Sequence, residues 1–411
     1  MKQYILLYQL LTLLLLFMVS FFPRQLDAKI PYAIFSLAIL LLPIFFKNAR
    51  EDIAAKITTT LFFTLFLIAS LLSTIFSIDY SHSIPQFLLY FSYFVIFTSI
   101  RSLFPTHKSK ELFTTPFTGQ ALLICYLLFA ILLSVISLYH TVILHYINRE
   151  SEGISFMWIY YGHNHLAALL IFAIPFSLYL LKKYWNLISL RILLMGIFCF
   201  MLIALFFTFG FTSILSLWLS ALIALLFFAP FTRLQKLAGS FILVVALEVF
   251  LLGTFVLPEK IGFEKRPLRS AATRLIYWQN ALDNFSNNPI TGSGLDTFRI
   301  VNKTSKYKPP LGSFYTHNFF LQMLSDAGIL GFLSSILLIG SILWQSIKKI
   351  KGQRLMTNGQ RRLGTMLFVG LLASTLNSLV DFDWQLPTVF LFFWIMAALQ
   401  IPPHKGVQKL R

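Results

Sequence analysis

The stretch YTHNFFLQMLSDAGILGFLSSILLIGSILWQ, residues 315–345, places one histidine and one aspartate in an otherwise apolar helical pattern. Such a stretch is typical of a transmembrane helix, because about 20 apolar residues cross the hydrocarbon core of a bilayer. It is longer than one perpendicular crossing requires, so we expect its first turns, before Gly328, to lie at or above the membrane interface. A long polar segment precedes it and delivers His317 to the head of the helix.

The rest of the chain is also strongly apolar. Its 411 residues are 57% hydrophobic and only 12% charged, whereas charged residues make up about 25% of soluble domains. We therefore predict an all-α polytopic membrane protein with about twelve transmembrane helices. The predicted spans cover residues 4–22, 30–46, 57–76, 84–100, 119–147, 163–181, 190–208, 211–230, 236–257, 315–346, 363–380 and 385–401.

Basic residues are distributed unequally over the connections between these spans. The connections after the second, fourth and tenth spans carry three, three and six Lys and Arg, whereas those after the third, seventh and eleventh carry none. Because Lys and Arg mark cytoplasmic loops, both termini are predicted to be cytoplasmic. The one long loop, residues 258–314, is then extracytoplasmic, and its nine basic residues do not oppose this since long loops translocate largely regardless of charge.

The predicted organisation along the chain follows from this topology. Residues 1–257 form transmembrane helices 1–9, 258–314 an extracytoplasmic loop with an amphipathic helix, 315–401 helices 10–12, and 402–411 a cytoplasmic tail. We expect the segment 4–22 to be retained, because it is longer than the apolar core of a signal peptide and lacks a small-x-small cleavage site. The excess of Lys and Arg, 33 against 15 acidic residues, fits cytoplasmic loops, and we expect no nucleic-acid partner.

Within the long loop, RSAATRLIYWQNALDNFSNNP (residues 269–289) has the pattern of an amphipathic helix. Ser270 is the predicted N-cap, and the Asn-Asn-Pro sequence that ends at Pro289 is the predicted stop. The helix could lie on the outer membrane surface or cap a cavity between spans. Its apolar residues recur at helical spacing: Leu275, Trp278, Leu282 and Phe285.

The loop is also basic, with nine Lys and Arg against four acidic residues. Arg266, Arg269 and Arg274 cluster near the start of the predicted helix. The planar guanidinium binds phosphate oxygens in a bidentate manner, so these side chains are candidates for an anion site. The alternative is a solvated basic loop that contacts the anionic headgroups of membrane lipid.

Two further outer connections are polar. One opens the sixth span with His163, Asn164 and His165, and the other holds Asp381 and Asp383. At the start of a helix the rings of a His-x-His pair point apart, so we expect no metal and no cofactor. We expect structural roles instead, with Asn164 as a helix cap and an aspartate capping the helix that begins near the proline at position 387.

Four of these segments, in this order, resemble the O-antigen ligase and polymerase family. They are GHNHLAALLIFAIP (162–175), TRLIYWQNALDNFSNNPITGSGLDTF (273–298), THNFFLQMLSDAGILGFL (316–333) and NSLVDFDWQLPTVFLFFW (377–394). The resemblance covers the C-terminal two thirds, and the first 150 residues match only as generic spans. The family's patterned positions fall on Arg274, Trp278, Pro289, Gly292, Gly294, Phe298, His317, Asn318, Leu321, Gly328 and Gly331.

The resemblance implies an integral membrane glycosyltransferase of the bacterial inner membrane. Such enzymes take a glycan from undecaprenyl diphosphate at the outer leaflet and pass it to an acceptor hydroxyl without a metal. It implies that Arg274 holds the donor diphosphate and that His317 is the catalytic histidine. The remaining predicted site residues are Arg269 and Arg266 for the diphosphate, with Asn318, Asn164, His165, Asp381 and Asp383 in support.

One departure from the family pattern concerns the span that begins FGFTSILSLWLSAL, residues 209–222. The family usually carries an arginine early in this span, and this chain has none between Arg191 and Arg233. Either another arginine (Arg266, Arg269 or Arg149) substitutes, or the donor is held differently.

Glycan transfer from a polyprenyl diphosphate donor requires the same residue types. A polyprenyl donor keeps its tail in lipid and its diphosphate at the surface, where fixed arginines stabilise the leaving-group charge. A neutral histidine is the natural base for a sugar hydroxyl. The acceptor could be a lipid A-core sugar (a ligase), another lipid-linked repeat (a polymerase) or a protein hydroxyl. A solute transporter is the alternative of a different class, but the one mid-span charge, Glu248, is isolated.

Overall fold

The computed structural model describes residues 29–54, 58–103, 119–139, 163–208, 210–229, 231–260, 266–309, 312–352 and 358–401. Within these ranges the secondary structure is helical and contains no strand, which confirms the all-helical class. The predicted span 4–22 and the predicted tail 402–411 lie outside the described residues.

Six of the described helices are long and apolar enough to cross a membrane. Three shorter apolar helices, Ile30–Phe46, Leu122–Leu138 and Pro387–Gln400, coincide with other predicted spans. The chain is thus a polytopic helical membrane protein, and the full count of twelve spans stays a prediction. The six are Thr58–Ile75, Tyr80–Arg101, His165–Lys183, Ile188–Phe207, Phe211–Phe228 and Phe319–Gly352.

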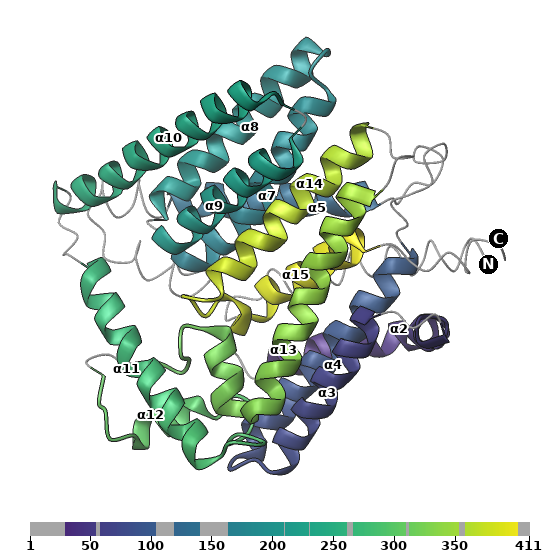
Figure 1. Ribbon diagram of the computed structural model, residues 1–411, viewed down its shortest axis with the longest axis vertical. Coiled ribbons are helices and arrows are strands. Elements are labelled where there is room, and N and C mark those ends of the chain that lie inside the picture. The colour runs from purple at the N-terminus through teal and green to yellow at the C-terminus, as the bar shows by residue number, and fades with distance from the viewer. Residues whose placement is uncertain are drawn as a thin grey trace. The chain divides into compact units, whose positions relative to one another are not determined.

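The helices form two compact units by their contacts, and the division of the chain into membrane and extracytoplasmic segments stays a prediction. The first unit combines residues 1–118, 266–345 and 378–411, and the second combines residues 119–265 and 346–377. The elements of the first unit are α2 (Lys29–Ala54), α3 (Thr58–Ile75), α4 (Tyr80–Leu103), α11 (Arg266–Asn287), α12 (Phe298–Thr304), most of α13 (Phe319–Gly352), the short η2 (Asp383–Gln385) and α15 (Pro387–Gln400) (Figure 1).

Aromatic side chains fill the core of the first unit. Helix α4 packs against α2, α3 and α15, and the ring of Phe63 on α3 lies 4.4 Å from that of Trp394 on α15. Trp384 stacks on Phe390 at 4.9 Å, which fixes the connection before α15 against the helix itself. Tyr93 on α4 donates a hydrogen bond to the carbonyl of Pro387 at 2.9 Å. The connection that carries the two aspartates is therefore packed on α15, and the start of α15 is hydrogen-bonded to α4.

Helix α13 is broken at Gly328, whose φ of +62° is outside the helical range. A Cβ at this position would lie 2.3 Å from the carbonyl oxygen of Ile290, so only glycine fits. The next amide, of Ile329, donates to the carbonyl of Pro289 at 2.9 Å. The break in the helix thus contacts the segment of the long loop that directly follows α11, and it separates the first turns of α13 from the remainder.

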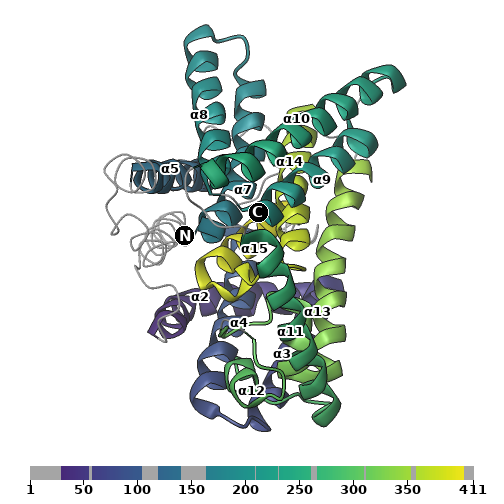
Figure 2. The ribbon, with the colours of Figure 1, turned by 90° about the vertical axis from the view of Figure 1, so that its left-hand side faces the viewer.

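The second unit is built around α7 (His163–Lys183), whose apolar residues are almost all buried. Helix α7 packs against α5 (Gly119–Leu138), α8 (Ile188–Phe207), α9 (Phe211–Phe228) and α14 (Asn358–Asn377), which Figure 2 labels. A Cβ at Gly370 of α14 would lie 3.1 Å from the ring of Phe172, so glycine lets α14 approach α7 closely. Helix α10 (Arg233–Lys260) packs on α9 and exposes Phe241 and Ile242, as suits a helix that faces lipid.

Three predicted helix caps are wrong. Helix α11 begins at Arg266, so Ser270 lies inside the helix; Pro267 favours this earlier start because its fixed φ suits the first turn. Helix α7 begins at His163, which places Asn164 in the first turn and not at the cap. The predicted stop of α11 at the Asn-Asn-Pro sequence is confirmed, since the helix ends at Asn287.

The third wrong cap concerns α15. Its N-cap is Leu386, and no side chain caps the helix, because the turn η2 separates Asp381 from the helix start and contains Asp383. Pro387 occupies the first turn, where its missing N–H costs nothing.

Three connections that the charge pattern assigns to one side of the membrane meet within the first unit. The amide of Ile78, after α3, donates to the carbonyl of Ser293 in the long loop at 2.9 Å. The amide of Phe319, at the start of α13, donates to the carbonyl of Ser378 at 2.8 Å. The three connections therefore share one end of the unit, and that this end is extracytoplasmic stays a prediction.

Candidate functional site

The backbone around His317 is held in an uncommon conformation. His317 has a φ of +57°, in the left-handed region that non-glycine residues seldom adopt. The next residue, Asn318, caps α13, since its side-chain oxygen accepts from the amide of Leu321 at 3.0 Å. The preceding amide, of Thr316, donates to the side-chain oxygen of Gln322 at 2.9 Å. Both neighbours of His317 are thus tied to the first turn of α13, and Asn318 serves as a cap.

The imidazole of His317 lies between two aromatic rings. Tyr277 of α11 stacks on it with 5.6 Å between ring centroids and an interplanar angle of 12°. Phe382, in the connection after α14, meets it edge-on at 4.6 Å and 83°. These contacts fix the plane of the imidazole, and they leave 18% of the side chain exposed.

Asp381 is the carboxylate partner of this histidine. Its Oδ1 lies 3.4 Å from His317 Nδ1, and its side chain has no exposed surface. The distance is longer than the ~2.9 Å of a good N–H···O hydrogen bond. Burial by itself would raise the pKa of Asp381, but the contact with His317, the nearby Arg274 and the amide of Phe382 together lower this pKa to about 2. The carboxylate is therefore ionised at neutral pH.

The same carboxylate reaches Arg274 of α11. One terminal nitrogen of the guanidinium lies 3.5 Å from Asp381 Oδ2, and 17% of the arginine side chain is exposed. Its Nε is buried and, among the residues that the structure describes, has no hydrogen-bond partner. Because a guanidinium has five N–H donors, Arg274 keeps donors available for an anion while Asp381 holds it in place. Asp381 thus lies between the arginine and the histidine.

The structure gives less detail on the other predicted site residues. Arg266 and Arg269 lie in the first turns of α11 and Asn164 in the first turn of α7, but their side chains are outside the described part of the chain. The half-buried His165 belongs to the second unit.

Asp383 is buried in η2, two residues after Asp381. Among the described residues, no group of three or more His, Cys, Asp or Glu side chains is arranged to hold a metal.

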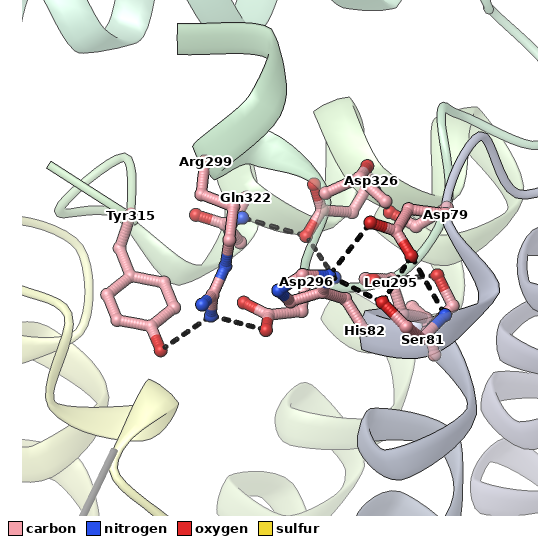
Figure 3. Close-up of polar contacts among 12 residues, drawn as sticks. Asp79, Ser81, His82, Leu295, Asp296, Arg299, Tyr315, Gln322 and Asp326 are labelled. Carbon is pink, nitrogen blue, oxygen red and sulfur yellow. Dashed lines mark hydrogen bonds and ion pairs between the residues drawn. The ribbon is translucent and has the colours of Figure 1, made fainter. Parts of the chain in front are cut away.

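A second polar cluster, which the sequence did not indicate, lies at the start of α12 (Figure 3). Asp296 pairs with Arg299, and Arg299 also reaches the hydroxyl of Tyr315 at 3.5 Å. Burial raises the pKa of Asp296, although the guanidinium of Arg299 opposes the rise. Asp296 has a φ of +57° and precedes α12, so this pairing does not follow from helical spacing and had no local signal in the sequence.

The Gly-x-Gly sequence before this cluster docks the loop onto the rest of the unit. Gly294 has a φ of +115°, and a Cβ there would lie 2.0 Å from the hydroxyl oxygen of Ser77 in the turn after α3. The amide of Gly294 donates to the carbonyl of Asp326 on α13 at 2.9 Å, and the Ser83 hydroxyl of α4 donates to the carbonyl of Leu295 at 2.8 Å. The motif therefore joins α3, α4 and α13 and supports the loop that carries α11 and α12.

Comparison with known families identifies part of this chain. Residues 196–336 match the family model Wzy_C, described as O-antigen ligase. The match includes Arg274 and His317, and Asp381 lies beyond its end. It confirms the family resemblance and indicates a glycosyltransferase-type enzyme. No curated protein matches the chain.

Proposed function

We propose that this chain, whose residues 196–336 belong to the O-antigen ligase family, transfers a glycan from undecaprenyl diphosphate to an acceptor hydroxyl outside the bacterial inner membrane. The observation that carries the proposal is the position of buried Asp381. It lies within 3.5 Å of Arg274 and 3.4 Å of His317, so one carboxylate fixes both a phosphate-binding group and a proton acceptor.

Arg274 binds the diphosphate of the donor in this proposal. The bond from the sugar to the diphosphate breaks during transfer, and negative charge develops on the departing oxygen. A guanidinium that Asp381 already holds in position stabilises this charge without reorganising, which is where electrostatic catalysis is most effective. The buried Nε, which has no partner among the described residues, supplies one donor for a phosphate oxygen.

His317 acts as the general base on the acceptor. Its Nδ1 faces Asp381, so the proton resides there and Nε2 is left to accept the proton of the acceptor hydroxyl. The acceptor oxygen forms its bond to the anomeric carbon, the hydroxyl proton moves to Nε2, and undecaprenyl diphosphate leaves with the bonding electron pair. Asp381 stabilises the imidazolium that results.

Reconstitution tests the proposal. The purified chain in proteoliposomes receives an undecaprenyl-diphosphate glycan and, in separate reactions, a lipid A-core acceptor, further donor lipid or an acceptor protein. We expect a single transfer to the core sugar, as in a ligase. A ladder on the donor lipid identifies a polymerase, and transfer to protein identifies an oligosaccharyltransferase of the same chemistry. If the chain transfers glycan to none of the three acceptors, the proposal is contradicted.

A further inference from the structure

The polar cluster at the start of α12 contains a mostly buried arginine that the proposed mechanism does not use. Arg299 pairs with Asp296, and the carbon at the centre of its guanidinium lies 4.9 Å from the ring centroid of Phe314 and 5.9 Å from that of Tyr315. One of its nitrogens reaches the Tyr315 hydroxyl at 3.5 Å. Figure 3 shows Arg299 between the carboxylate and the phenol.

Two aromatic rings connect this arginine to the candidate base. The ring of Tyr315 stacks on Phe382, with 5.5 Å between centroids and an interplanar angle of 18°. Phe382 in turn contacts the imidazole of His317 edge-on at 4.6 Å, and its amide donates to Asp381 Oδ1 at 2.8 Å. A shift of Phe382 would therefore displace both the imidazole of His317 and the carboxylate of Asp381.

A second route joins the same cluster to the backbone of His317. The amide of Asp296 donates to Asp326 Oδ2 at 3.0 Å, and the Gln322 side chain donates to the same oxygen at 2.7 Å. The oxygen of that Gln322 amide accepts from the amide of Thr316, the residue before His317. Asp296 and His317 are the two non-glycine residues with positive φ among those described, and one network links them.

We propose that Arg299 is a positioning residue for His317, acting through Tyr315 and Phe382. The inference rests on the proposed function, in which His317 is the base. Arg299 holds the Tyr315 ring, the Tyr315 ring holds Phe382, and Phe382 sets the tilt of the imidazole. A base must lie within hydrogen-bond reach of its proton, and a displacement of about 1 Å costs about 100-fold in rate.

A double-mutant cycle in proteoliposomes tests this chain of contacts. Arg299→Lys keeps the charge beside Asp296 but loses the planar guanidinium, and Tyr315→Phe keeps the ring but loses the hydroxyl. We expect each variant to lower kcat by about 10- to 100-fold with the KM for the undecaprenyl-diphosphate glycan unchanged. The double variant should be no slower than the slower single variant, because both changes break one link. Lys303→Gln, an exposed basic residue on the same helix, is the matched control and should leave kcat and KM unchanged.

Three outcomes overturn the inference. The first is a double variant whose loss is the product of the two single losses, which shows that the residues act independently. The second is lower protein in the membrane with unchanged kcat per molecule, which shows a structural role only. The third is parental turnover by His317→Gln, which removes the base on which the inference rests. If His317→Gln is inactive and the cycle is multiplicative, the proposed function stands and the positioning role alone fails.

Discussion

His317 has a carboxylate partner that lies far from it in the sequence. The sequence identified the histidine as a base and Asp381 as a supporting residue of a separate outer connection. In the structure their side chains are 3.4 Å apart, and the same carboxylate lies 3.5 Å from Arg274. Three residues that lie on separate segments of the sequence therefore form one group, and the variants below test its role in transfer.

Asp381→Asn tests the carboxylate. The amide keeps the size of the side chain but removes the charge that holds Arg274 and stabilises the imidazolium, so we expect transfer to fall by about 100-fold or more. Asp283→Asn, on the exposed face of α11, is the matched control and should keep the parental rate. Initial rates of glycan transfer at saturating donor measure both. A parental rate in Asp381→Asn would show that the carboxylate is not needed.

The pH dependence of transfer belongs to the same prediction. The pKa of Asp381 is lowered from 3.8 to about 2, so its contribution to stability is complete above pH 3.8 and is lost as the pH falls toward 2. Asp381 therefore stays ionised near neutral pH, and its protonation should lower transfer only in strongly acidic buffer, which initial rates across the acid range would check. In Asp381→Asn this acid loss should be absent, because the amide does not titrate.

Arg274→Lys tests the diphosphate site. An ammonium is a point charge and cannot contact Asp381 and a phosphate oxygen in one plane, so we expect transfer to be reduced severely, and Arg274→Ala to abolish it. Protein levels in the membrane should be close to parental in both variants. Near-normal product with lysine would indicate that a diffuse positive charge is enough to bind the donor diphosphate. The measurement is the KM for the lipid-linked donor together with kcat.

At the scale of elements, the break in α13 at Gly328 lets the long loop pack against this helix. Gly328→Ala would place a Cβ 2.3 Å from the Ile290 carbonyl at a φ of +62°, so we expect the variant to lose about 1–3 kcal/mol of stability. Gly340→Ala on the same helix meets nothing within 4 Å and should be neutral or slightly stabilising. Thermal unfolding in detergent compares the two. Equal melting temperatures would show that the break does not depend on glycine.

The sequence predicted the helices better than their ends. Hydropathy and 3.6-residue periodicity are local, so the positions of the apolar helices followed from them. The stop of α11 followed from the Asn-Asn-Pro sequence, which is also a local signal. The start of α11 and the break at Gly328 depend on other contacts: Pro267 outweighs Ser270, and the carbonyl of Ile290 occupies the space beside the glycine. The short helix α12 lacks enough residues to show a period.

At the scale of the whole molecule, the site depends on how distant connections come together. Charge alternation predicted that the turn after α3, the long loop and the connection after α14 share one side, and hydrogen bonds join them at one end of the first unit. No local pattern predicts that Tyr277 stacks on His317 or that Asp296 pairs with Arg299 beside Tyr315. These contacts follow from the folding of the unit.

Cysteine labelling tests which side this end faces. Ser305 in the long loop donates a hydrogen bond to Asn280, so its exposed neighbour Lys306 is the better position for the introduced cysteine. In a background without Cys125 and Cys199, Lys306→Cys should react with an impermeant maleimide in cells whose inner membrane is intact. Lys351→Cys, at the predicted cytoplasmic end of α13, should react only after permeabilisation. The reverse pattern would contradict the predicted topology.

The most direct test of the central claim is glycan transfer by His317→Gln at neutral pH, measured beside donor binding and membrane level. Glutamine keeps polarity and much of the size of histidine but accepts no proton. We predict near-parental protein level and donor binding, with transfer lowered by about 100- to 10,000-fold. Turnover close to the parental rate would contradict the account, because His317 would then not be the base.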